Sequence, residues 1–466
     1  MKESADGTAL PPLTWRSWLV LALFAAATLC VIRPVAFSVA LPGLPSLGRL
    51  RVNIDNKLAP WLVILVLVAS TAIRVQREVV DGFVGGDGIE PYAIVILIFA
   101  LAYICISLDE SGLLSCVAMV VACRWGRNGR VLLMCFYLLS IAMAVLTNND
   151  VAVLCLTPII CAFSDATGIG AEPFLTAMFV AANTASMALF IGNPTNIVVA
   201  QANGVSFLSY TAWMGLPFLA AAAAGALALY VLSLRTVARA IPAGLDLRPR
   251  DMIRSKWRVA VGVFVLVSCL VALSVSSIHG VAVWMVTLPF GVAMLVADAA
   301  IDLCTAPVVK RLPYGIVPFS LGMFIIVECL GTQGWTPRLA WVLRRMCPSA
   351  TAAVFVIGAV STVVCNVLNN LPATILFSRA FQHPVFFAHT DDRTRRGAMF
   401  ALVVGSNLGA NFSLVGSLAG LMFQGIAMQK GRRIGYFRFM RACAPTMVVQ
   451  LAVSCAVLAA ELAIKR

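Results

Sequence analysis

Long runs of apolar residues recur along the whole chain, and short polar or basic segments separate them. A helix that rises 1.5 Å per residue needs about 20 apolar residues to cross a hydrocarbon core roughly 30 Å thick. Unbroken runs of this length also differ from the alternating pattern of a membrane barrel, the other structure that satisfies backbone amides in lipid. The runs therefore predict an all-α polytopic membrane protein with about 10–12 transmembrane helices.

The composition agrees with this fold class. Hydrophobic residues make up 61% of the 466 residues and charged residues only 12%, whereas an ordinary soluble domain has roughly 25% charged residues. The net charge is +14, but the basic residues cluster in short loops, which indicates membrane orientation and argues against a nucleic-acid partner. Most of the 14 cysteines lie inside apolar runs without CxxC pairs, so they predict buried thiols. The three histidines are scattered, so we expect no metal site and no cofactor.

Charged segments divide the chain. The segment 235–258 carries seven positive and two negative residues, which places it in the cytoplasm by the positive-inside rule. We expect a polar N-terminal tail, a first transmembrane repeat, this basic linker and a second transmembrane repeat, at 1–16, 17–234, 235–258 and 259–466. The first repeat is expected to include clear spans at Trp18 to Ala40, Pro60 to Ile73 and Tyr92 to Leu108. A further apolar stretch, Phe174 to Ile191, is expected to run up to the break at residues 192–196.

Polar breaks interrupt the apolar runs at matching places in the two halves. Asn148-Asn149 recurs 221 residues later as Asn369-Asn370, and Gly192 recurs 224 residues later as Gly416. If these breaks form re-entrant hairpins and broken helices, the loop charges bring the second set in from the opposite face. That is the inverted-repeat topology of secondary transporters. One basic cluster would then lie outside, against the positive-inside rule: Arg379, Arg393, Arg395 and Arg396.

The breaks form the candidate binding site. Irregular backbone is tolerated at bilayer depth only where it lines a cavity or is buried in protein, because unpaired amides cost several kcal/mol in lipid. Half-helix ends supply backbone donors and acceptors, and Asn side chains supply both kinds of group. No Lys or Arg lies beside the breaks in the sequence. The candidate substrate-binding or ion-binding residues are Thr147, Asn148, Asn149, Asp150, Asn193, Thr195, Asn196, Asn369, Asn370, Asn407 and Ser417.

Asp150 is the candidate proton carrier. A carboxylate at bilayer depth costs about 2.5 to 3.5 kcal/mol on insertion scales, which favours reversible protonation. The alternative is that Asp150 only caps the helix expected to begin at Val151, and the two roles do not exclude each other. Three more acidic residues, Asp109, Glu110 and Glu328, lie at the ends of spans. For them a solvated or interfacial role is the default expectation, and a direct role in the site is the alternative.

Two sets of motifs resemble a known family. The first half contains Ser107-Leu-Asp-Glu-Ser-Gly112 with Arg124-Trp-Gly126, Asn149-Asp150 with Leu156-Thr-Pro158, and Asn196-Ile-Val198. The second contains Phe319-Ser-Leu-Gly-Met323, Asn369-Asn370 with Pro372, and Gly405-Ser-Asn-Leu-Gly409 with Gly416-Ser-Leu-Ala419. Together they resemble the arsenite and antimonite permeases, or arsenical pump membrane proteins, of the ion transporter superfamily. The chain departs from that pattern at Val151, at Gly192-Asn-Pro-Thr-Asn196 and at Leu414.

The resemblance implies a secondary transporter of the plasma membrane that exports arsenite or antimonite by proton antiport and so confers arsenical resistance. The alternatives on the same scaffold are a sodium-coupled carrier of dicarboxylates or other anions and a sodium/proton antiporter. An intramembrane enzyme is not expected, because no nucleophile and base occur at a plausible spacing. The chain has no Walker A loop, so coupling to ATP would need a separate cytoplasmic ATPase subunit. A homodimer is also left open.

Overall fold

The computed structural model describes residues 10–40, 49–86, 88–125, 127–238, 249–302 and 305–465. Some predictions fall outside this part of the chain. They concern residues 1–9 of the tail, residues 41–48 and 87 of the first repeat, Gly126 of the family-like motif, residues 239–248 of the linker, and residues 303–304 and 466 of the second repeat.

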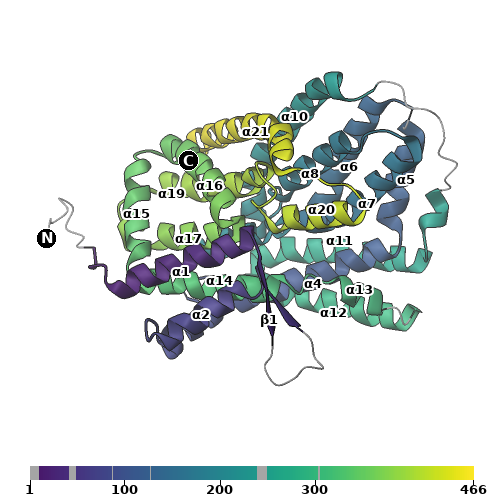
Figure 1. Ribbon diagram of the computed structural model, residues 1–466. Coiled ribbons are helices and arrows are strands. Elements are labelled where there is room, and N and C mark those ends of the chain that lie inside the picture. Colours follow the sequence, from purple (N-terminus) through teal and green to yellow (C-terminus); the bar gives the residue numbers. More distant parts are fainter. Residues whose placement is uncertain are drawn as a thin grey trace.

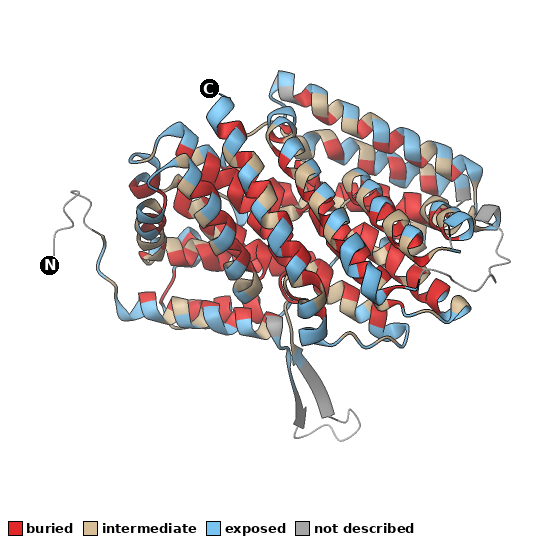
Figure 2. Ribbon diagram, turned by 90° about the horizontal axis from the view of Figure 1, so that it is seen from above, coloured by how far each residue is buried: buried red, intermediate tan, exposed pale blue. Residues whose placement is uncertain are grey.

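Helices make up the body of the molecule (Figure 1). Within the described residues, nine stretches are long and apolar enough to cross a membrane. Buried residues fill the interior of the bundle, while exposed residues, many of them apolar, cover its outside (Figure 2). The predicted class, a polytopic helical membrane protein, is confirmed. The nine stretches contain α4 (Pro91–Glu110), α6 (Gly129–Leu146), α7 (Asn149–Thr167), α10 (Phe207–Thr236), α11 (Lys256–His279), α12 (Val283–Asp302), α13 with α14 (Thr305–Arg311 and Ile316–Thr332), α16 (Ala350–Leu368) and α21 (Tyr436–Ile464).

The first apolar run does not form a single span. Helix α1 (Trp15–Ile32) ends well before Ala40, so the expected span from Trp18 to Ala40 is wrong in its last part. Pro34 follows and cannot donate a backbone hydrogen bond, and it disfavours helical backbone at the residue before it. The chain continues as an antiparallel hairpin that projects from the helical body (Figure 1), formed by β1 (Val35–Ala40) and β2 (Arg49–Ile54).

The expected span from Pro60 to Ile73 is also shorter than predicted. Helix α2 (Ala59–Ala69) stops at a turn in which Thr71 has a positive φ of 53°. A π-turn, η2 (Val75–Val79), and the short helix α3 (Val80–Val84) then lead to α4.

Each half contains a helical hairpin and a broken helix. In the first half, α6 and α7 form the hairpin, and α8 (Glu172–Ser186) and α9 (Pro194–Ala202) form the broken helix. In the second half, α16 and α17 (Asn370–Gln382) correspond to the hairpin, and α19 (Asp392–Leu408) and α20 (Leu418–Gln429) to the broken helix. The remaining elements are α5 (Leu113–Trp125), η3 (Phe190–Gly192), η4 (Pro249–Met252), α15 (Trp335–Met346), α18 (Pro384–Phe387) and η5 (Gly409–Asn411).

The two halves interlock through the broken helices. Helix α20 of the second half packs on α7 of the first half, and α9 of the first half packs on α17 of the second half. Each hairpin therefore lies beside the short helix contributed by the other half. The inverted relation of the halves and the domain boundaries stay predictions.

The first broken helix ends earlier than expected. The predicted run from Phe174 to Ile191 is interrupted after Ser186, where α8 stops. The Asn196 amide group donates to the backbone oxygens of Ser186 at 2.7 Å and Leu189 at 3.2 Å, which satisfies carbonyls freed by the break. Gly192 lies so close to the Ser186 carbonyl that a Cβ there would overlap it.

The basic cluster on the predicted outer face is partly neutralised. Arg379 pairs with Glu328 at 3.0 Å. Arg395 pairs with Asp392, and its guanidinium lies 4.0 Å from the centre of the Phe387 ring. These contacts reduce the net positive charge that the predicted topology places outside the cell.

Candidate functional site

Four helices begin next to one another at the centre of the bundle, and each begins with a polar cap. The capping oxygens of Asn148, Asn193, Asn369 and Ser417 accept backbone N–H bonds at 2.8, 3.2, 3.4 and 3.2 Å, at the starts of α7, α9, α17 and α20. Asn369 also has a positive φ of 71°, which turns the chain sharply between α16 and α17. The caps explain locally why the sequence breaks its helices at these points.

The first turns of all four helices line one small cavity of about 20 Å³. This volume holds about one water molecule. Because helix N-termini carry a partial positive charge and free N–H groups, the cavity favours acceptor groups of a solute. The cavity brings together five of the predicted site residues: Asn149, Asp150, Asn193, Asn370 and Ser417.

Asp150 borders this cavity and a second one of about 30 Å³. Its carboxyl makes no hydrogen bond or ion pair with another residue that the structure describes. The N-terminal cap of α7 is the Asn148 side chain, so Asp150 lies in the first turn and is not the capping residue.

The second cavity also contains a guanidinium. Arg311 of α13 lines it, so a basic side chain lies near the first break in space although none lies beside it in the sequence. Arg311 comes from the second half of the chain and is brought to α7 by the packing of α13 on α4. Its guanidinium binds Asp109 and Glu110, each at 2.6 Å, so its charge is balanced by two carboxylates from the end of α4.

The ion pairs of Arg311 show that Asp109 and Glu110 lie in a charged network at the end of α4. Glu110 also binds Arg254 at 2.7 Å, and the Arg254 backbone N–H donates to the Ser111 carbonyl at 3.0 Å. Asp109 and Glu110 are therefore mostly buried ion-pair partners, so of the expected solvated or interfacial roles the solvated one is wrong. Together they connect the basic linker to the wall of the cavity that Asp150 borders.

Asn407 joins the two broken helices behind the cavity. Its oxygen accepts hydrogen bonds from Ser186 Oγ at 2.7 Å and Asn193 Nδ2 at 2.9 Å. Its amide group donates to Asn196 Oδ1 at 2.7 Å and to the Val403 carbonyl at 2.8 Å. Asn407 is therefore a fully bonded connector and does not line the cavity.

A second chain of amides reaches the cavity and includes two residues that were not among the predicted site residues. Asn149 donates to Asn183 at 3.1 Å, and Asn183 donates to Asn411 at 3.0 Å. The buried Asn149 Oδ1 has no hydrogen-bond partner among the described residues, and it belongs to a side chain that lines the cavity. An unpaired buried acceptor at a cavity points to a ligand or water. The sequence did offer a signal for Asn183, because it lies 224 residues before Asn407 and so occupies the matching position in the first half.

The remaining predicted site residues support the breaks. The Thr147 hydroxyl donates to the Met143 carbonyl at 2.7 Å, and the Asn369 amide group donates to the Val415 carbonyl at 3.1 Å. Thr195 is buried and lies 3.4 Å from Asn196 Oδ1. Asn148 lines only the second cavity.

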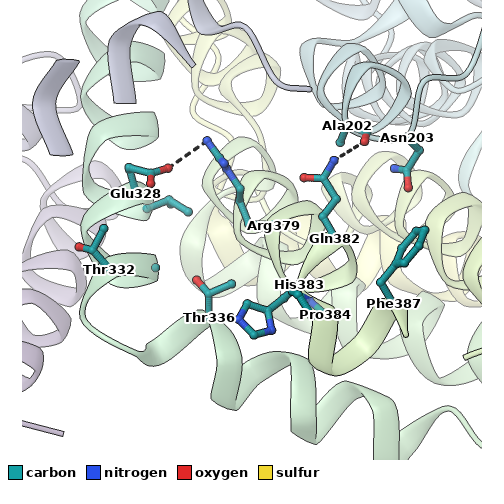
Figure 3. A pocket seen from close by; sticks show the side chains of 12 residues that line it. Ala202, Asn203, Glu328, Thr332, Thr336, Arg379, Gln382, His383, Pro384 and Phe387 are labelled. Atoms are coloured by element: carbon teal, nitrogen blue, oxygen red, sulfur yellow. Dashed lines mark hydrogen bonds and ion pairs between the residues drawn. The ribbon is translucent and has the colours of Figure 1, made fainter. Parts of the chain in front are cut away.

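A larger vestibule of about 690 Å³ lies at the other ends of α9 and α17. Gln382 at the end of α17 donates to the Ala202 carbonyl at the end of α9, which holds the two helix ends together (Figure 3). The Glu328 and Arg379 ion pair lies at one side of this vestibule (Figure 3). Glu328 of α14 is thus an ion-pair partner of Arg379 on α17. Arg379 lies near the end of α17, whereas Asn370 at the start of the same helix lines the central cavity.

The sequence profile of the arsenical pump membrane proteins matches residues 66–458. The chain belongs to this family. An arsenical pump membrane protein of Yersinia enterocolitica is 32% identical over 375 residues, which cover 78% of this chain and 85% of that protein. The predicted family, a multi-pass plasma-membrane location and a role in transport are confirmed.

Two solved structures have a similar fold. MtrF of Neisseria gonorrhoeae, from a class of antimetabolite efflux pumps, is 13% identical with a TM-score of 0.54, over 97% of this chain and 95% of that chain. The YdaH transporter of Alcanivorax borkumensis is 12% identical with a TM-score of 0.56, over 97% and 99%. They show that this arsenical pump family member has the fold of known membrane transporters.

Proposed function

We propose that this arsenical pump family member exports trivalent arsenic or antimony hydroxide in exchange for protons. The observation that carries the proposal is the cavity where four helix N-termini meet, because it combines amides and a hydroxyl with one carboxylate. The hydroxyl groups of such a solute can donate to Asn oxygens and accept from amide and backbone N–H groups. The naming of the relatives as arsenical pumps supports this class of solute.

Asp150 supplies the proton exchange in this proposal. Ionised, its carboxylate accepts a hydrogen bond from a hydroxyl of the solute, and protonated it loses that acceptor strength. Solute and proton therefore compete for the same carboxyl, as antiport requires. The absence of an ion pair to Asp150 among the described residues leaves the carboxyl available for both.

The cavity must enlarge to admit the solute, since about 20 Å³ suits a single water molecule. The short helices α9 and α20 belong to opposite halves and pack on the opposite hairpins. Movement of one half against the other would open the cavity toward one face of the membrane at a time.

An anion carrier is the second candidate, because the four helix N-termini favour negative charge. A sodium-coupled carrier would need sodium for movement of its anion, whereas the proposed exchanger needs only a proton gradient. Dependence on sodium separates the two candidates.

Uptake of radiolabelled arsenite into everted membrane vesicles tests the proposal. We expect uptake when the vesicle interior is acidic, and its loss in Asp150→Asn. Asp165→Asn is the matched control, because this carboxyl lies on the same helix but is 63% exposed and pairs with Arg432. Absence of arsenite uptake under every gradient, with sodium-dependent movement of a carboxylate, would overturn the proposal.

A further inference from the structure

A groove of about 590 Å³ lies between the ends of four helices, away from the central cavity. Its walls come from α6, the start of α8, the end of α10 and the start of α21. Much of this lining is apolar, with Leu133, Phe174, Leu229 and Leu232 among the contributing side chains. Leu229 is buried, whereas Leu232 is 40% exposed, so the apolar wall continues to the outside of α10.

The groove lies at the face predicted to be cytoplasmic. Helix α10 ends at the start of the basic linker, and α21 begins directly after a loop that contains Lys430, Arg432 and Arg433. Both segments are rich in positive charge, which marks the cytoplasmic membrane surface. The outer side of α10 near this end is apolar and exposed, as expected for contact with acyl chains: Leu227, Val231, Leu232 and Leu234.

Two arginines form the polar end of the groove. Arg438 and Arg441 are three residues apart on α21 and so lie on the same side of the helix. Arg438 pairs with Glu172, which also lines the groove and balances its charge. Arg441 forms no ion pair with any residue in the described part of the chain, so the groove keeps one uncompensated guanidinium.

We propose that this groove binds an anionic phospholipid of the inner leaflet. The phosphate would lie on Arg441, since a guanidinium presents paired N–H donors to phosphate oxygens. An acyl chain would lie along Leu133, Leu229 and Leu232. Among the residues that the structure describes, the one uncompensated guanidinium of the groove matches one phosphodiester, and basic pockets between helices on the cytoplasmic side recognise such headgroups. The inference is independent of the transported solute.

Binding of dioleoyl phosphatidylglycerol to the purified full-length protein tests the inference. We expect native mass spectrometry to detect bound phosphatidylglycerol in preference to phosphatidylcholine. Arg441→Gln should weaken this binding about fivefold, the effect of one basic residue near an anionic headgroup. Arg433→Gln is the control, because it removes the same charge from the exposed loop outside the groove and should leave binding unchanged.

A second measurement needs no variant. A photoreactive phosphatidylglycerol should crosslink to peptides from residues 169–176, 229–238 or 438–442, which contribute to the walls of the groove. Equal loss of lipid in Arg441→Gln and Arg433→Gln, equal binding of the two lipids, or crosslinks only elsewhere would overturn the inference. If inorganic phosphate displaced the bound phosphatidylglycerol as effectively as unlabelled phosphatidylglycerol does, the groove would be a site for a free anion, and the inference would be overturned as well.

Discussion

At the scale of single residues, asparagine explains both the breaks and the cavity. An amide side chain donates and accepts at the same time, so one residue can cap a helix and bind the carbonyls left free by another break. Asn369 does both with its two ends, as its oxygen accepts from the Leu371 N–H and its amide group donates to the Val415 carbonyl in the other break. The sequence pattern identified these amides, but it could not separate those that line the cavity from those that support it.

Replacement of Asn407 tests the role of the connector. We expect Asn407→Ala to lower the free energy of unfolding by about 1–3 kcal/mol, because it leaves the buried Asn193 Nδ2 without its acceptor and removes the Asn407 donor from Asn196 Oδ1. Thermal unfolding in detergent measures the change. Asn203→Ala, which removes one local bond to the Val199 carbonyl at the end of α9, is the control and should have a smaller effect. Equal melting temperatures for the two variants would contradict this role.

At the scale of elements, close backbone contacts fix the geometry of the breaks between the paired half-helices. The predicted breaks were placed correctly at their polar residues, but the first break begins earlier, after Ser186. Apolar residues such as Met187 and Leu189 fill the break, so hydrophobicity alone could not show where α8 ends.

A glycine substitution tests the geometry of the first break. Gly192→Ala should cost about 1–3 kcal/mol of stability, because its Cβ would overlap the Ser186 carbonyl. Gly425→Ala on α20 is the matched control, since no atom lies within 4 Å of a Cβ there, and it should be neutral or stabilising. Chemical unfolding of both variants provides the measurement. A stable Gly192→Ala protein with unchanged transport would contradict the described geometry.

The ion pairs at the end of α4 give another element-scale prediction. Arg311→Gln should lower stability by roughly 1–3 kcal/mol, since it leaves Asp109 and Glu110, whose side chains are 8% and 10% exposed, without this partner. Adding Asp109→Asn should restore part of the loss. Arg254→Gln is the control, because its side chain is 67% exposed and the pair should contribute less than about 1 kcal/mol. No recovery in the double variant would show that charge balance is not the cause.

At the scale of the whole molecule, the helical membrane fold and the family were predictable from apolar runs and motifs. The packing of α9 and α20 on the hairpins of the opposite halves could not be predicted from the sequence, because it depends on contacts between residues far apart in the chain. For the same reason the sequence could not show that Arg311 lines a cavity with Asp150, because the two residues lie far apart in the chain. The β-hairpin after α1 was missed because its first strand continues an apolar run.

Cysteine labelling tests the predicted topology of the whole molecule. In a variant that lacks Cys304 and also Cys123, the exposed cysteine among the described residues, a membrane-impermeant maleimide should label Ala388→Cys in intact cells and Arg433→Cys only in everted vesicles. Both introduced residues replace exposed side chains, so access depends on the membrane face. Labelling of both from the same face would contradict the placement of the vestibule opposite the basic linker.

The most direct test of the account is whether arsenite movement drives proton movement through Asp150. Purified protein in proteoliposomes with a pH-sensitive dye inside would receive an arsenite gradient and no proton gradient. The account predicts that arsenite flux creates a pH difference in the wild type and in Asp165→Asn, and none in Asp150→Asn. An equal pH change in Asp150→Asn, or arsenite flux in the wild type with no pH change, would contradict it.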